Sequence, residues 1–406
     1  MSGQNRPSRP APSRPAEPVR EPARELAGGP DRAAQDAGRA LPPVPEGEAG
    51  ARVLTRRAPG MADVAQLAGV SHQTVSRVLN EHPNVREQTR LRVRAAMEQL
   101  GYRPNRAARA LVTGRSQTVG IVAQNTALYG PTSILTAVER VVSRVGFAVG
   151  VASVPVLDRA SIADAVARLL DQHVAGIVVI APVVSANEAL DDVPDDLPMA
   201  VIDGDPARPS RLVTVDQQLG ARLATRCLLA AGHETVWHVS GPPDWFDSAE
   251  RVVGWRQALV DAGAEVPPVL AADWSLGAGF EAGQLLARMP EARAVFAAND
   301  HLALGVMKAL RQAGLSVPGD VSIVGFDDIP EAGYVSPPLT TVRPDFEAVA
   351  EQAVRLLLAQ LDDPSPDGLP RLAPIPPSLV ERESVAPPGR AAPRRRAGVA
   401  RRSGGR

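Results

Sequence analysis

From Thr118 onward, short apolar runs of strand length alternate with amphipathic segments of helix length, and this alternation constrains the fold more than any other feature. The runs consist mainly of Val, Ile and Ala and cover residues 119–122, 148–151, 176–180, 200–203, 212–215, 236–239, 294–297 and 322–325. Amphipathic helices are predicted between most of them, for example over 161–170 and 221–230. Wholly apolar strands that alternate with helices are typical of parallel sheets covered on both faces. The region spans about 270 residues, too many for one open sheet, so two α/β lobes are expected.

A different pattern precedes this region. Short helices are predicted over 62–68, from the N-cap Ser71 to Leu79, over 87–100 and over 105–111. Gly69-Val70 forms a turn between the first two, and two short helices joined by a glycine-containing turn define a helix-turn-helix.

The second of these helices has two unlike faces. Val75, Val78 and Leu79 are spaced to pack inward. The other face carries hydrogen-bonding side chains: His72, Gln73, Ser76, Arg77 and Asn80. Arg pairs bidentately with guanine, and Gln or Asn with adenine, in the major groove of DNA. The alternative is the solvated polar face of an ordinary helical hairpin.

The distribution of charge favours the DNA interpretation. The formal net charge is −1, but residues 61–115 hold nine basic and four acidic residues, whereas residues 116–385 hold eighteen and thirty-four. A basic module therefore precedes an acidic body, which predicts a polyanionic partner for the small module alone.

Several motifs together resemble the LacI/GalR family of bacterial repressors. The headpiece motifs are 63–65, 68–71 and 74–80, followed by Gly-Tyr-Arg-Pro-Asn at 101–105, and the similarity continues to about Pro388. The resemblance implies an all-α helix-turn-helix headpiece plus hinge helix, followed by an α/β two-lobed, periplasmic-binding-protein-like (type I) effector domain with parallel sheets. It also implies a headpiece (61–103), a hinge helix and linker (104–116) and an effector-binding and dimerisation domain (117–385). Composition alone predicts the two flanking segments, a disordered Pro/Ala/Arg-rich extension (1–60) and a disordered basic tail (386–406). Whether residues 1–60 are translated stays open, because Met61 directly precedes the first helix.

The resemblance also implies roles for single residues. The base-reading positions of the family fall on His72, Gln73 and Arg77, and the supporting or phosphate-contacting positions on Ser71, Thr74, Ser76, Asn80, Asn84 and Thr89. Residues 105–111 match the hinge helix, with Asn105 at its start, Ala108 facing the minor groove and Leu111 as the wedge between base pairs. An apolar wedge unstacks one step and bends the duplex toward the protein. The alternative for Leu111 is packing on the body.

Polar residues follow several of the predicted strands. Asp203, Asn299-Asp300 and Asp327-Asp328 stand at strand ends, with Arg251 and Trp274 on segments between them. Ligands of open α/β sheets bind at the carboxyl ends of strands, and such side chains around an aromatic face suit a polyol. Ordinary strand-end capping is the alternative for each residue taken singly.

Within the resemblance, Asp203, Arg251, Asn299 and Asp327 would bind sugar hydroxyls and Trp274 would stack on the ring. Leu128, Ile134 and Phe346 would line the apolar side. Three positions depart from the nearest family pattern: Val215 replaces an aromatic residue, Asp247 a hydroxyl and Pro344 an amide. A sugar or glycoside effector is expected, with β-galactosides among the candidates.

The sequence carries no phosphate-binding loop, zinc-protease helix or nucleophile elbow, so no enzyme, cofactor or metal is predicted. One cysteine excludes an intrachain disulfide, and no apolar run reaches the length of a membrane span. The expected protein is a cytoplasmic repressor, nucleoid-associated when bound to double-stranded operator DNA, that acts as a homodimer on a palindromic site and is released by its effector. Corepression, a sugar transport protein and a sugar-processing enzyme are the alternatives.

Overall fold

The computed structural model describes residues 59–79, 82–102, 116–190, 193–194, 196–207, 211–363 and 372–389. Its first part is a three-helix headpiece, formed by α1 (Met61–Ala68), α2 (His72–Leu79) and α3 (Glu87–Leu100). Val64, Val75 and Val93 are wholly buried at its centre. The three helices predicted over these residues are confirmed, whereas the helix predicted over 105–111 lies outside the described residues.

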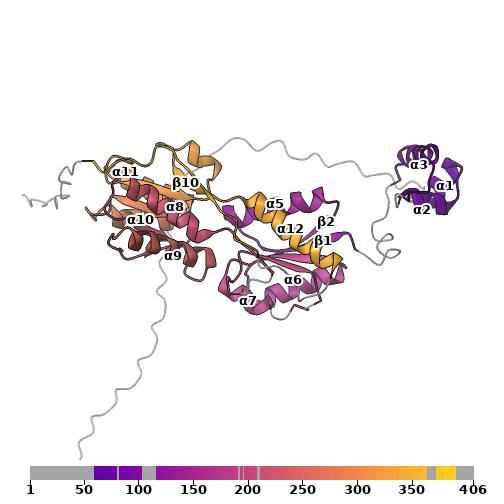
Figure 1. Cartoon of the computed structure of the whole chain (residues 1–406), viewed down its shortest axis with the longest axis horizontal. Coiled ribbons are helices and arrows are strands. Elements are labelled where there is room, and N and C mark those ends of the chain that lie inside the picture. The colour runs from indigo at the N-terminus through magenta and orange to yellow at the C-terminus, as the bar shows by residue number, and fades with distance from the viewer. Residues whose placement is uncertain are drawn as a thin grey trace, which may run out of the picture. The chain divides into compact units, whose positions relative to one another are not determined.

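The body begins with a lobe that we call the N-lobe. Its five-stranded parallel sheet has the order β2-β1-β3-β4-β5. The strands are β1 (Thr118–Gln124), β2 (Ala148–Val154), β3 (Gly176–Ile180), β4 (Met199–Ile202) and β5 (Leu212–Val213). The helices α5 (Tyr129–Arg144) and α12 (Phe346–Asp362) cover one face, and α6 (Arg159–Asp171) and α7 (Val184–Leu190) the other (Figure 1).

The second lobe, the C-lobe, has a six-stranded sheet of order β11-β10-β9-β8-β6-β7. The strands are β6 (Trp237–Ser240), β7 (Leu270–Ala271), β8 (Ala294–Ala297), β9 (Ser322–Phe326), β10 (Thr340–Arg343) and β11 (Ser378–Val380). One face is covered by α8 (Gln217–Ala230) and α9 (Phe246–Asp261), the other by α10 (Leu276–Leu286) and α11 (Asp300–Gln312). A 3-10 helix, η2 (Pro330–Gly333), follows β9.

All eight predicted strands are present, and the prediction of two α/β lobes with parallel sheets is confirmed. Three strands of the C-lobe were not predicted: β7, β10 and β11. Only β11 runs antiparallel to its neighbour, with Val342 opposite Leu379.

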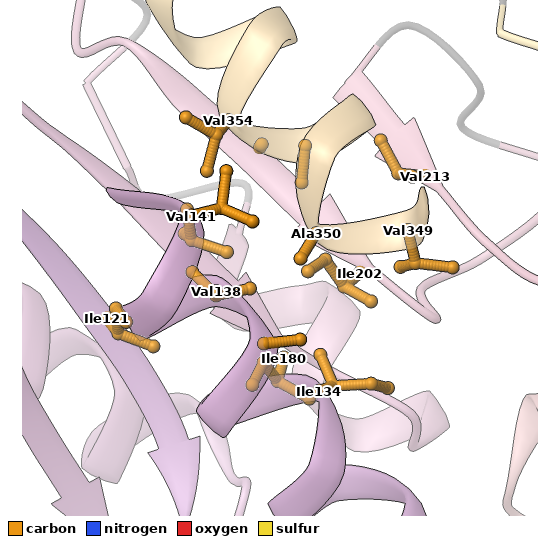
Figure 2. Packing of buried hydrophobic residues seen from close by; sticks show 14 of the residues in the cluster. Ile121, Ile134, Val138, Val141, Ile180, Ile202, Val213, Val349, Ala350 and Val354 are labelled. Atoms are coloured by element: carbon orange, nitrogen blue, oxygen red, sulfur yellow. The ribbon is translucent and has the colours of Figure 1, made fainter. Parts of the chain in front are cut away.

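The chain passes between the lobes more than once. It leaves the N-lobe after β5, returns with α12 after β10, and enters the C-lobe again at β11. In Figure 1 the late helix α12 lies beside the early helix α5, although about 200 residues separate them in the sequence. Val138 and Val141 of α5 face Ala350 and Val354 of α12 in one buried cluster (Figure 2). The N-lobe core therefore depends on α12, a helix that follows most of the C-lobe in the sequence.

Candidate nucleic-acid interface and ligand cleft

The turn that orients α2 is fixed by local chemistry. Gly69 has a φ of +63°, which a glycine adopts without steric cost, and the amide of Val70 donates to the Ala65 carbonyl at 3.0 Å. Ser71 then caps α2, because its Oγ accepts a hydrogen bond from the amide of Thr74 at 3.1 Å. The helix therefore begins where the sequence predicted.

The two faces of α2 are as expected. Val75 is wholly buried and Val78 is 5% exposed, while His72, Gln73 and Arg77 are exposed and Ser76 is half-buried. Ser71 and Asn84 are also exposed, and Thr74 and Thr89 are half-buried. Asn80, Asn105, Ala108 and Leu111 lie outside the described residues. The headpiece thus presents an exposed polar face that carries an imidazole, an amide and a guanidinium, side chains able to read base edges in a major groove.

The second candidate site lies where strands of the two lobes end. Asp203 follows β4 of the N-lobe, and Asn299 and Asp327 follow β8 and β9 of the C-lobe. Asp203 and Asp327 adopt positive φ angles of +57° and +103°, a region that Asp and Asn tolerate better than most residues. All three side chains are at least nine-tenths buried.

Arg251 of α9 is the cation of this site. Its side chain is 6% exposed, and its guanidinium lies 3.7 Å above the centre of the Phe326 ring. Its Nε donates to Gln217 Oε1 at 2.9 Å, and its Nη1 donates to the carbonyl of Ala298. Only Nη2 faces the carboxylates, at 3.8 Å from Asp247 and 4.0 Å from Asp327. Two of the five N–H donors of Arg251, one on Nε and one on Nη1, are therefore engaged by neutral acceptors.

An aromatic wall completes the site. Trp274, which is 8% exposed, lies flat against Gly241, where any Cβ would stand 2.2 Å from its ring. The ring of Trp245 meets it edge-on, with centroids 5.5 Å apart. Asn299 holds the wall in place, because its Nδ2 donates to the Trp274 carbonyl at 3.3 Å while its Oδ1 caps α11. The indole Nε1 of Trp274 is buried without a hydrogen-bond partner among the described residues.

Burial dominates the titration of the carboxyl groups here. It raises the pKa of Asp327 to about 7 and that of Asp247 to about 6, because the nearby Arg251 offsets only part of the cost. Burial and the neighbouring Asp247 hold the pKa of Asp203 well above its usual range, although Thr214 donates a hydrogen bond to it at 3.1 Å.

The cavity between the lobes is small in this structure. It is lined by Leu128, Tyr129, Gly130 and Pro131 of the N-lobe side and by Trp245, Asp247, Arg251, Trp274, Asn299 and Asp327 of the C-lobe. Its volume is about 30 Å³, room for only a few water molecules. A sugar ring that enters this cavity therefore requires the lobes or the lining side chains to move apart.

A short backbone contact holds the lobes together beside this cavity. The amide of Val184 donates to the Asp244 carbonyl at 3.0 Å, and the amide of Phe246 donates to the Pro182 carbonyl at 2.9 Å. Trp245, between the two bonds, packs against the hydrophobic cores of both lobes. We call these two hydrogen bonds the clasp.

Comparison with known proteins agrees with this architecture. Residues 60–105 match the model of bacterial regulatory proteins of the lacI family, and residues 225–385 match the periplasmic binding protein-like domain. The chain is 33% identical over 328 residues to the lactose operon repressor of Escherichia coli K12, covering 80% of this chain and 90% of that protein. The chain belongs to the lacI family.

One further relative and two solved structures are also similar to this LacI-family chain. The regulator CelR of Thermobifida fusca is 35% identical over 321 residues, covering 75% of this chain and 93% of that one. A solved CelR–cellobiose complex superposes with a TM-score of 0.60 and 31% identity over 80% of this chain and 99% of that one. The lac repressor dimer bound to operator and an anti-inducer superposes with a TM-score of 0.71 and 31% identity over 81% of this chain and all of that chain.

The structure brings five of the eight predicted effector residues of this LacI-family chain to the cavity: Leu128, Arg251, Trp274, Asn299 and Asp327. Ile134 instead lies in the N-lobe core at 1% exposure, and Phe346 lines a separate cavity of about 660 Å³ with Thr126 and Arg140. Asp203 is buried behind the lining. Their assigned roles stay predictions.

Five lining residues were not among the predicted effector residues. Tyr129, Gly130 and Pro131 directly follow Leu128, Trp245 stands in the loop after β6, and Asp247 is on the first turn of α9. The strand-end rule would have found Trp245 had it been applied to β6 as well as to β4, β8 and β9. Within the described ranges, no group of His, Cys, Asp and Glu has the arrangement of a metal site, and none of the helices is long and apolar enough to cross a membrane.

Proposed function

We propose that this chain is a transcriptional repressor that binds double-stranded operator DNA through α2 and releases it when a sugar or glycoside binds between the lobes. The observation that carries the proposal is that one chain combines an exposed polar helix face with an acidic, aromatic-walled cleft. Its similarity to the lactose operon repressor and to CelR, which has been solved with cellobiose, supports both halves. The protein would work in the cytoplasm, associated with the nucleoid while bound to DNA.

The DNA-binding roles follow from the exposed face. His72, Gln73 and Arg77 would read base edges, whereas Ser71, Thr74, Ser76, Asn80, Asn84 and Thr89 would contact or support contacts to phosphates. The hinge at 104–116, with Asn105, Ala108 and Leu111, would enter the minor groove as a pair. A homodimer on a palindromic site is proposed, because one headpiece reads only a half-site.

The ligand acts through the two lobes. Asp203 belongs to the N-lobe, whereas Arg251, Trp274, Asn299 and Asp327 belong to the C-lobe, so a ligand that contacts both responds to their separation. Coupling requires that the ligand prefer one lobe arrangement over the other. The cavity of about 30 Å³ beside Trp274 supports this, because a sugar ring stacked on Trp274 would have to displace the residues that line it. Induction is proposed as the mode, and β-galactosides are among the candidate effectors.

Arg77→Ala tests the reading helix. DNA sites would first be selected from a random library with the intact protein. Loss of a bidentate base contact should then cost roughly 1–3 kcal/mol, about tenfold to a hundredfold in affinity for the selected site, with little change for unrelated DNA. Arg94→Ala removes the same charge from the exposed surface of α3 and should weaken binding to all sequences alike. Unchanged discrimination in Arg77→Ala would refute the assignment.

A further inference from the structure

The cleft contains more buried negative charge than its one cation can balance. Asp203, Asp247 and Asp327 surround Arg251, and the exposed fractions of the Asp247 and Asp327 side chains are 16% and 9%. Three carboxylates against one guanidinium leave an excess of two negative charges when all are ionised. Isolated charges are costly to bury, so these carboxyls are stabilised either by protonation or by a bound group of opposite charge.

Arg251 is poorly placed to supply that compensation. Its Nε and Nη1 donate to Gln217 and to the Ala298 carbonyl, and the distances of 3.8 and 4.0 Å from Nη2 to Asp247 and Asp327 exceed hydrogen-bonding range. Among the described residues, neither carboxylate accepts a hydrogen bond. Asp327 lines the cavity and is nine-tenths buried, yet its carboxylate has no hydrogen-bond donor among the described residues.

Neighbouring carboxylates of the same lobe show that the fold can satisfy such groups. Asp300 is wholly buried, yet it accepts hydrogen bonds from the Thr341 hydroxyl and the Ile329 amide at 2.6 and 2.9 Å. Asp328 accepts from Arg382 Nη2 at 2.6 Å and from Arg343 Nε. Asp247 and Asp327, which face the cavity, differ from these two neighbours in having no hydrogen-bond donor among the described residues.

The chemistry of the missing partner follows from these contacts. A neutral polyol supplies hydroxyl donors but no charge, whereas an ammonium group supplies up to three donors together with one positive charge. Charge-assisted N–H···O hydrogen bonds are roughly twice as strong as neutral ones. The two tryptophan rings beside the carboxylates suit such a ligand, because indole faces attract cations as well as sugar C–H groups.

We propose that Asp247, acting with Asp327, makes the cleft selective for effectors that carry a protonated amine on a polyhydroxylated ring, that is, for amino sugars over neutral sugars. The ammonium group lies between the two carboxylates, and the ring lies against Trp274. Asp247 stands on the first turn of α9, one helical turn before Arg251. Arg251 donates its hydrogen bonds to Gln217 and Ala298, so replacing the Asp247 side chain does not remove an acceptor from either bond. This inference rests on the proposed sugar response.

The test compares matched ligands on the full-length protein at pH 6.5 by titration calorimetry. D-Galactosamine and D-glucosamine would be measured beside D-galactose, D-glucose and the two N-acetyl derivatives, which keep the nitrogen but not the charge. The amino sugars should bind at least tenfold more tightly than either neutral set. Asp247→Asn should abolish that preference and Asp247→Glu should restore part of it. Asp244→Asn, at an exposed position three residues earlier, should preserve it.

The outcomes separate this inference from the function on which it rests. If neutral sugars bind as tightly as amino sugars, or if Asp247→Asn keeps the preference, the selectivity is overturned while the sugar response stands. If none of the six ligands binds, the inference of amino-sugar selectivity fails. The proposed sugar response fails as well if larger glycosides such as cellobiose also do not bind. The comparison within the unaltered protein needs no variant, so it stays decisive even if Asp247→Asn folds poorly.

Discussion

The burial of Asp327 predicts a pH-dependent stability that one substitution should remove. Moving a carboxyl pKa from 3.8 to about 7 corresponds to roughly 4 kcal/mol of disfavoured ionisation in the folded state. Because the folded pKa is raised, the folded chain binds more protons than the unfolded chain between these values. Its stability therefore falls as the pH rises from about 4 to about 7 and then levels off.

Asp327→Asn keeps the shape of the side chain and tolerates the φ of +103°, but it cannot ionise. The cost that Asp327 imposes grows from roughly 2 kcal/mol at pH 5 to roughly 4 kcal/mol at pH 8, so the advantage of the variant should grow by roughly 2–3 kcal/mol. His238, whose pKa burial lowers to about 4, titrates in the opposite sense but is common to both proteins and cancels.

Urea unfolding followed by tryptophan fluorescence provides the measurement. The four tryptophans, Trp237, Trp245, Trp255 and Trp274, all belong to the C-lobe, so the signal reports the lobe that contains Asp327. Parallel stabilities of the two proteins between pH 5 and pH 8 would refute the reasoning.

Asp328→Asn is the matched control. It should destabilise the protein at both pH values, because Arg343 and Arg382 lose the charge that they share.

Two further predictions concern the cleft. Val184→Pro removes one clasp hydrogen bond at the first residue of a helix, where proline is tolerated, and should speed hydrogen exchange of the Phe246 amide roughly fivefold. Val184→Ala keeps the amide and should leave that rate unchanged. Equal exchange rates in the two variants would show that this hydrogen bond does not restrain the lobes. Trp274→Ala should weaken sugar binding at least tenfold without altering DNA affinity, and Trp274→Phe should recover part of the loss. Unchanged sugar binding in Trp274→Ala would count against the stacking role.

Long buried strands were predictable because their side chains are apolar on both faces. The strands β7, β10 and β11 were not predicted from the sequence because they are short or polar. In β10, Thr340 and Thr341 are almost wholly buried, but they are used as hydrogen-bonding partners of Arg382 and Asp300. A strand whose buried residues are polar has no apolar run to reveal it. The return of α12 to the N-lobe was equally hidden, because an amphipathic pattern does not indicate which sheet the helix will cover.

The candidate cleft was predictable where a polar residue follows a strand, as Asn299 and Asp327 do. It was not predictable where side-chain direction decides. Ile134 is on the same helix as the lining residue Tyr129, yet its side chain points into the N-lobe core rather than the cavity. Trp245 lines the cavity from the loop whose flanking residues form the clasp, and its place there would have been found by applying the strand-end rule to β6.

The clasp also has the strength that a ligand-controlled switch requires. A protein hydrogen bond contributes roughly 0.5–1.5 kcal/mol net, so two of them favour the arrangement with the small cavity by about 1–3 kcal/mol. Coupling free energies between an effector site and a second site are typically about 1–3 kcal/mol as well. A ligand whose entry separated Pro182–Val184 from Asp244–Phe246 would therefore work against a restraint of the same size as the response it has to produce.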